Sequence, residues 1–174
     1  MEIWDLYNRD RIKTGKTMVR GGKYEKDAYH IVIHVCIFNH DGKMLIQQRQ
    51  PFKKGWPGMW DVTVCGSAVT GEDSRSAARR EVGEELGYKL DLTNIRPSLT
   101  INFEFGFDDV YLVEDDPDIN KMVLQKEEVR QVKWASNNEI TDMIGKGIFI
   151  PYYKGFIDLL FDMRKHPGVH SRKE

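Results

Sequence analysis

The sequence has few of the features that mark secreted or membrane-spanning proteins. Only two of its 174 residues are cysteines, Cys36 and Cys65, and their surroundings show neither disulfide nor zinc-ligand spacing. The longest apolar run, residues 31–38, is interrupted by His34 and is far too short to cross a bilayer. The N-terminal residues are punctuated by charges and do not form a signal peptide. We therefore expect reduced thiols, no membrane contact and a cytoplasmic location.

An excess of basic charge is also absent. Lysine and arginine together number 26 against 27 acidic residues, which gives a net charge of −1. A protein that binds nucleic acid through bulk electrostatics usually needs a basic face. The local exceptions, Lys53, Lys54 and the Arg79–Arg80 pair, are explained more simply as solvated side chains or phosphate contacts. We expect a small-molecule partner and no nucleic acid, and we leave a homodimer open.

The chain shows no internal repeat and no low-complexity linker, so we expect a single domain over residues 1–165, followed by a polar tail over 166–174. Patterns of apolar and turn-forming residues predict strands at 2–7, 29–39, 44–48, 61–65, 95–105, 110–114 and 129–135. They predict helices at 74–86, 137–145 and 151–165, a hairpin or long loop at 11–28 and a loop at 53–60. Without regular βαβ repetition, this order predicts an α/β fold with a mixed sheet covered on both faces.

Acidic side chains gather on one face of the predicted helix at 74–86. At about 100° per residue, Glu81, Glu84 and Glu85 lie within about a third of a turn of one another. Such like charges repel, so they are either solvated or neutralised by a cation. The preceding loop, residues 66–71, consists of small residues that let backbone groups approach a ligand. Carboxylate oxygens with open positions for water and phosphate suit Mg²⁺ or Mn²⁺.

The region from Gly66 to Tyr88 resembles the Nudix box. Its matching positions are Gly66, then after five residues Glu72, then after seven more Arg80-Glu81-Val82-Gly83-Glu84-Glu85-Leu86-Gly87-Tyr88. Every fixed polar or glycine position matches, and only Tyr88 departs, since the pattern has an aliphatic residue there. The resemblance implies a Nudix-type α/β/α sandwich. It also implies a divalent-metal-dependent hydrolase that cleaves a diphosphate linkage in a nucleoside diphosphate derivative or a related small molecule, by attack of water on phosphorus.

The same resemblance implies roles for individual residues. Glu81, Glu84 and Glu85 would hold the metal, with the carbonyl of Gly66 as an additional ligand. Arg80 would orient the loop and the helix together with Glu72.

The general base is left open, because Nudix proteins take it from different places. Glu81 or Glu84 is one option. Glu127 or Glu128, just before the strand at 129–135, is the other, and an exposed charged turn is the simpler explanation of that pair.

A second resemblance covers segments outside the box. Those segments, which are similar to type I isopentenyl diphosphate isomerase, are Val19-Arg20-Gly21, Tyr29-His30, Phe38 to Lys43, and above all Lys53 to Trp60. That enzyme shares the Nudix fold but moves a double bond by protonation and deprotonation. Cys65 matches the position of its catalytic cysteine, whereas Ser67 replaces a metal-binding histidine. Because the isomerases have an eroded Nudix box, we favour the hydrolase and keep isopentenyl diphosphate delta-isomerase as the alternative.

Four further residues are candidates for substrate binding. Lys53 and Lys54 could reach phosphate groups, and Trp56 could stack on a substrate or pack as an aromatic corner. Asp109, with Asp108, could form a bulge, a turn or a substrate contact. Three residues of the strand at 29–39 lie on the same face: His30, His34 and Cys36. They could bind a metal or could be packed in the core.

Overall fold

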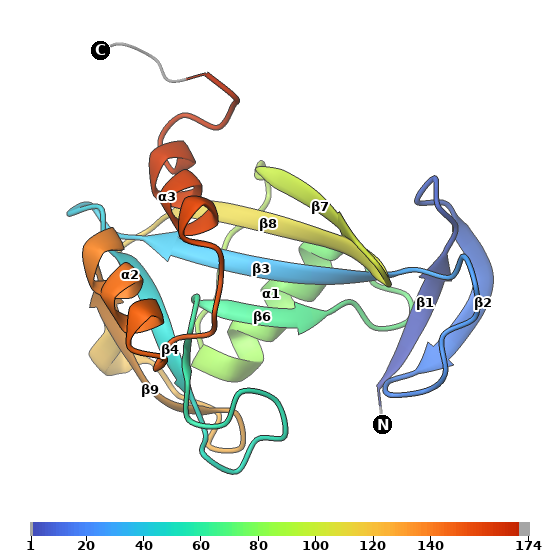
Figure 1. Cartoon of the computed structure of the whole chain (residues 1–174), viewed down its shortest axis with the longest axis horizontal. Helices are drawn as coiled ribbons and strands as arrows, with labels where there is room; N and C mark the ends of the chain where they lie inside the picture. The colour runs from blue at the N-terminus through green and yellow to red at the C-terminus, as the bar shows by residue number, and fades with distance from the viewer. Residues whose placement is uncertain (1, 171–174) are drawn as a thin grey trace.

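The structure, a computed structural model, describes residues 2–170. It contains a large mixed sheet with helices on both faces, and a separate two-stranded hairpin at the N-terminus (Figure 1). The strands are β1 (Ile3–Tyr7), β2 (Lys13–Val19), β3 (His30–Phe38), β4 (Met44–Arg49), β5 (Trp60–Asp61), β6 (Val64–Ser67), β7 (Leu99–Phe103), β8 (Gly106–Glu114) and β9 (Val129–Ala135). The helices are α1 (Ser74–Leu86), α2 (Asn137–Gly145) and α3 (Lys154–Met163), with a short 3₁₀ turn, η1 (Ile119–Lys121).

Strand β3 runs through the middle of the large sheet. It is parallel to β8 on one side, and the other pairings of the sheet are antiparallel. On its other side, β4 pairs with β3 only at Phe38 and Met44, and β6 then takes over this edge from Val35 to Val32. The sheet is therefore mixed, as predicted, and β3 and β4 diverge to make room for β6.

Alternation of side chains along β3 builds a core on each face of the sheet. Ile33 and Val35, both fully buried, pack in one cluster with Val82 of α1. Phe38 packs in the other cluster with Leu160 of α3, and α2 joins the same side. Figure 1 shows α1 on the opposite side of the sheet from α2 and α3. The predicted α/β/α sandwich is confirmed.

Helix α1 has the bounds predicted from its local sequence. The side chain of Asp73 accepts a hydrogen bond from the Ser76 backbone N–H at 2.7 Å, which caps the first turn. Gly87 ends the helix in the left-handed conformation, with φ of 61°. Ala78 and Val82 are fully buried against the sheet, which fixes the side of α1 that carries the glutamates beside this packed stripe.

Several predicted elements differ from the observed ones. Of the strand predicted at 95–105, only Leu99–Phe103 forms β7. The strand predicted at 61–65 is divided into β5 and β6. Asp108 and Asp109 lie inside β8 and not in a bulge or turn, because they pair in register with β3 and β7. The helix predicted from residue 151 begins at Lys154, because the Ile150 N–H bonds to the Trp60 carbonyl at 2.9 Å and holds the preceding segment on the sheet.

The predicted hairpin at 11–28 contains β2, which pairs with β1. Trp4 and Met18 form a small buried cluster there, and the Thr70 N–H bonds to the Ile3 carbonyl at 2.8 Å. The hairpin thus lies beside the loop that precedes α1. The predicted tail at 166–174 lies in part outside the described residues, and within residues 2–170 no helix is long and apolar enough to cross a membrane.

Candidate active site

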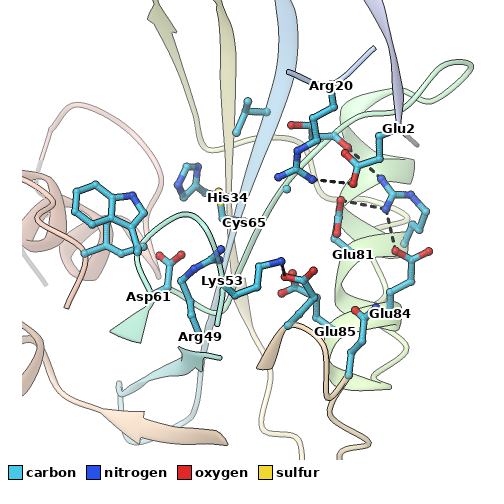
Figure 2. A pocket seen from close by; sticks show the side chains of 18 of the residues that line it. Glu2, Arg20, His34, Arg49, Lys53, Asp61, Cys65, Glu81, Glu84 and Glu85 are labelled. Atoms are coloured by element: carbon cyan, nitrogen blue, oxygen red, sulfur yellow. Dashed lines mark hydrogen bonds and ion pairs between the residues drawn. The ribbon is translucent and has the colours of Figure 1, made fainter. Parts of the chain in front are cut away.

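A cavity of about 470 Å³ opens between α1, β6 and the loop that precedes β5. Figure 2 shows Glu81, Glu84 and Glu85 along α1 on one side, and Asp61, His34 and Cys65 on the other, with Arg49 and Lys53 between them. Its lining residues are Glu2, Arg20, Val32, His34, Arg49, Lys53, Trp56, Asp61, Cys65, Gly66, Ser67, Arg80, Glu81, Glu84, Glu85, Gln125, Glu128, Ile150 and Tyr152. The cavity brings together five of the predicted Nudix-box residues: Gly66, Arg80, Glu81, Glu84 and Glu85.

Glu81 lies against the backbone of Gly66 at the end of β6. A Cβ atom at position 66 would lie 2.7 Å from Glu81 Cγ and closer still to the carboxyl group. Glycine is therefore required for this close approach. Burial raises the pKa of Glu81, and the neighbouring Arg80 opposes this shift.

Glu85 is a buried carboxylate without a cationic partner. Its side chain is 5% exposed, and the Gln47 amide donates a hydrogen bond to its Oε2 at 2.9 Å. Within residues 2–170, Glu85 forms no ion pair with Lys, Arg or His. Burial raises the pKa of Glu85 to about 8, and the nearby Glu81 adds to this effect. Burying an ionised carboxylate without an opposite charge is unfavourable, so this position favours a cation as its partner.

Arg80 connects α1 to the loop before it. Its Nε and Nη2 donate to the two carboxylate oxygens of Glu72 at 2.8 and 3.0 Å, and Nη2 also donates to the Ser67 carbonyl at 3.1 Å. Its Nη1 lies 3.0 Å from Glu81 and from the half-exposed Glu84. This geometry suits the orienting role expected for Arg80 and Glu72.

These residues fit a divalent cation by their chemistry. The three carboxylates and the Gly66 backbone offer the hard oxygen donors that Mg²⁺ and Mn²⁺ prefer. Within residues 2–170 no three acidic, histidine or cysteine side chains already converge as a ligand set. Arg80 pairs with both Glu81 and Glu84. The uncompensated Glu85 and the close approach of the Glu81 carboxylate to the Gly66 backbone are the observations that support the fit.

Of the other predicted residues, some line the cavity and some do not. Lys53 and Glu128 line the cavity and form an ion pair with each other. Glu127 and Lys54 are exposed and do not line it. Trp56 lines the cavity, is 49% exposed and has a φ of 51°.

Asp109 does not occupy the position expected for a substrate contact. Its side chain is fully buried, pairs with Arg11 and accepts a hydrogen bond from Thr100 at 2.7 Å. Successive residues of a strand point to opposite faces, so its neighbour Asp108 reaches His34 instead. The prediction for Asp109 is therefore corrected, because its carboxylate is already used inside the protein and lies outside the cavity lining.

A buried polar cluster at the opposite wall was missed by the sequence patterns. His34 Nδ1 lies 2.7 Å from Asp108 Oδ1, and its Nε2 lies 3.0 Å from the Tyr152 hydroxyl. Tyr152 donates in turn to Asp61 Oδ1 at 2.8 Å, and Cys65 is paired with His34 across β3 and β6. The residues come from β3, β5, β6, β8 and the segment before α3, so no local spacing links the whole cluster.

Burial and the neighbouring side chains together shift the pKa values in this cluster. Burial lowers the pKa of His34, but Cys65 and Asp108 outweigh it and the net shift is upward. Burial raises the pKa of Asp61 and of the Cys65 thiol. The trio predicted on one face of β3 does not form a metal site in the described residues, since His30 stacks on Trp4 with ring centroids 4.3 Å apart.

Comparisons with known proteins identify the family of this chain. Residues 28–153 match the NUDIX domain. An uncharacterized Nudix hydrolase of Listeria monocytogenes is 45% identical over 170 residues, which cover 98% of this chain and 99% of the relative. An isopentenyl-diphosphate Delta-isomerase of Salmonella heidelberg is 39% identical over 69 residues, or 39% of this chain and 38% of the isomerase. A crystal structure from Deinococcus radiodurans has the same fold, with a TM-score of 0.73, 23% identity, and coverage of 91% of this chain and 97% of that one. Since the domain match and the Listeria relative both span most of the sequence, this chain belongs to the Nudix hydrolase family.

Proposed function

We propose that this enzyme is a divalent-metal-dependent pyrophosphohydrolase. It cleaves a diphosphate linkage in a nucleoside diphosphate derivative or a related small molecule, by attack of water on phosphorus. The observation that carries the proposal is the wall formed by Gly66, Glu81, Glu84 and Glu85 in one cavity, in which the buried Glu85 pairs with no Lys, Arg or His side chain of residues 2–170.

Each residue of this wall has a role in the proposal. Glu81, Glu84 and Glu85 hold Mg²⁺ or Mn²⁺, with the Gly66 carbonyl as a further ligand. When bound, the cation supplies charge neutralisation for the diphosphate oxygens and favours in-line attack by water. Arg80 keeps the loop and α1 in position through its contacts with both.

Cationic side chains near the glutamates would contact the phosphates. Arg49 and Lys53 line the cavity between its two walls (Figure 2). Lys53 is paired with Glu128, so a phosphate that binds Lys53 would release the Glu128 carboxylate. Glu128 therefore joins Glu81 and Glu84 as a candidate general base, whereas the exposed Glu127 does not.

Isomerisation of isopentenyl diphosphate is the second candidate, because Cys65 lines the same cavity. Burial raises the pKa of this thiol, which disfavours the reactive thiolate. His30, which matches an isomerase metal ligand, does not line the cavity and lies 2.9 Å from the Phe105 carbonyl through its Nδ1. We therefore favour hydrolysis.

The test is a panel of diphosphate substrates with Mg²⁺ or Mn²⁺, in which release of phosphate or monophosphate is measured. A proton-exchange assay on isopentenyl diphosphate runs beside it. We expect hydrolysis that is lost in Glu85→Gln and retained in Cys65→Ala. Isomerisation that depends on Cys65, without hydrolysis, would overturn the proposal.

We also propose a cytoplasmic location, because both cysteines are free thiols in the structure. A homodimer stays a prediction.

A further inference from the structure

Asp61 has one carboxylate oxygen that the protein itself does not use. Its side chain is 2% exposed, and both hydrogen bonds that it accepts, from the Val62 N–H and the Tyr152 hydroxyl at 2.8 Å each, go to Oδ1. Within residues 2–170 no donor is bonded to Oδ2. In that range, the fully buried side-chain polar atoms without a hydrogen-bond partner are Trp4 Nε1 and Arg164 Nε. Asp61 Oδ2 is not among them, so it is not fully buried. Since Asp61 lines the cavity, this oxygen is available to a ligand.

The side chains around Asp61 already satisfy one another's hydrogen bonds. The Tyr152 hydroxyl carries one proton and donates it to Asp61, so His34 Nε2 donates to the Tyr152 oxygen and Nδ1 donates to Asp108. If the proton instead resides on Asp61 Oδ1, the two hydrogen bonds that link Asp61, Tyr152 and His34 reverse their direction. The total charge of these side chains is unchanged. In both arrangements Oδ2 keeps an acceptor lone pair for the cavity.

The same part of the cavity has apolar walls. Val32 precedes His34 by two residues on the same face of β3, and Ile150 precedes Tyr152 by two residues. A ligand group that fits here is therefore largely apolar but carries a hydrogen-bond donor for Asp61. A purely apolar group, such as an isopentenyl chain, would leave Oδ2 without water and without a donor, which is unfavourable.

Trp56 supplies a flat surface to this cavity. Its backbone is in the left-handed region, which is strained for a residue with a side chain. The surrounding loop holds it there, since the Met59 N–H bonds to the Trp56 carbonyl at 3.3 Å and Arg49 Nε bonds to the Gly55 carbonyl at 3.0 Å. A half-exposed indole fixed at a cavity is suited to stacking on a planar ring.

We propose that the wall opposite α1 is a nucleobase subsite in which Asp61 Oδ2 accepts a hydrogen bond from an amino or ring N–H group of the base. His34 and Tyr152 position Asp61, and Trp56 contacts the ring. The inference rests on the proposed function and names its substrate class, since a nucleoside diphosphate would extend from this wall, past Arg49 and Lys53, to the glutamates of α1 (Figure 2).

The test is titration calorimetry with Mg²⁺ and probes that the enzyme cannot cleave. These are the α,β-methylene analogues of adenosine, guanosine, cytidine and uridine diphosphates, with methylenediphosphonate as the base-free probe. We expect at least one nucleoside analogue to bind more tightly than the base-free probe. Asp61→Asn places an amide donor in the subsite, so it should weaken the binding of that analogue about 10-fold or more, equivalent to about 1.4 kcal/mol. The binding of methylenediphosphonate should be unchanged.

Two further variants make the result specific. Tyr152→Phe removes the hydroxyl that positions Asp61 and should weaken the same analogue in the same direction. Tyr153→Phe is the matched control, because Tyr153 is 89% exposed and outside the cavity lining, and it should bind every probe as the wild type does. If Asp61→Asn does not fold, Tyr152→Phe and the wild-type comparison decide.

The inference is overturned if no nucleoside analogue outcompetes the base-free probe, or if neither cavity variant weakens the preferred one. Either result leaves hydrolysis of other diphosphates standing. Conversely, a preference for a nucleoside analogue in a protein that hydrolyses no diphosphate would overturn the proposed function and not the subsite.

Discussion

The side chain of Glu81 rests directly on Gly66, at a distance that admits no Cβ atom on the glycine. This contact joins the backbone near the end of β6 to the acidic face of α1. Because the obstructed atoms belong to the end of a flexible side chain, a larger residue at position 66 would displace the carboxylate more readily than it would unfold the protein.

We therefore expect Gly66→Ala to impair catalysis selectively. A displacement of about 1 Å at a reacting centre can reduce the rate roughly 100-fold, so kcat/KM should fall by up to that factor. The free energy of unfolding in urea should change by less than about 1 kcal/mol.

Gly83→Ala, in the helix that carries Glu81, is the matched control for Gly66→Ala in β6. A Cβ at position 83 meets no atom within 4 Å, and alanine is favoured over glycine in a helix interior by about 0.5–1 kcal/mol. This variant should be slightly more stable and fully active. Equal kinetics of the two alanine variants would contradict the role given to Gly66.

Arg80→Lys should lower kcat/KM by about 10-fold or more, because lysine cannot donate to Glu72, Ser67 and Glu84 together. Loss of these charged hydrogen bonds should also cost about 1–2 kcal/mol of unfolding free energy. Both effects are measured against Arg79→Lys, whose exposed position on α1 predicts no change. Similar kinetics for the two lysine variants would exclude a positioning role for Arg80.

The stability of the metal-free enzyme should depend on pH through Glu85. Its pKa is about 8 in the folded protein against an ordinary value of 4.5, so the folded state carries no penalty below about pH 4.5. The penalty grows as the unfolded chain ionises and is complete above about pH 8, where burying the charge costs roughly 2–5 kcal/mol.

Glu85→Gln removes this titration and keeps the shape of the side chain. In EDTA its unfolding free energy should exceed that of the wild type by an amount that rises between about pH 5 and 8. Thermal unfolding over this range provides the measurement. A difference that stays constant with pH would show that the Glu85 charge is not buried in the folded enzyme.

Thr63→Val should destabilise the point at which β3 and β4 separate. The Thr63 hydroxyl donates to the Leu45 carbonyl at 2.6 Å and accepts from the Ile37 N–H at 2.9 Å, and its side chain is fully buried. Valine leaves both backbone groups unpaired, at a cost of about 2–3 kcal/mol in urea unfolding. Thr63→Ser keeps the hydroxyl and should lose only about 1 kcal/mol, so equal losses would argue against the bridge.

The sequence by itself determined the elements that depend on local patterns. The 3.6-residue period placed three glutamates on one face, and Asp73 and Gly87 supplied the signals that begin and end α1. The core strand β3 could be predicted in the same way, from a run of β-branched residues. These features involve neighbours in the chain, so they can be predicted without the fold.

Only the tertiary structure decided the wall opposite those glutamates. His34, Asp61, Asp108 and Tyr152 are brought together by strand pairing and by the return of the chain after Phe149, across separations that carry no periodic signal. The register of β8 between β3 and β7 likewise chose Asp108 for the cluster and buried Asp109 beside Arg11. A shift of one residue exchanges the two faces of a strand, so the acidic pair could not be assigned until its partners were known.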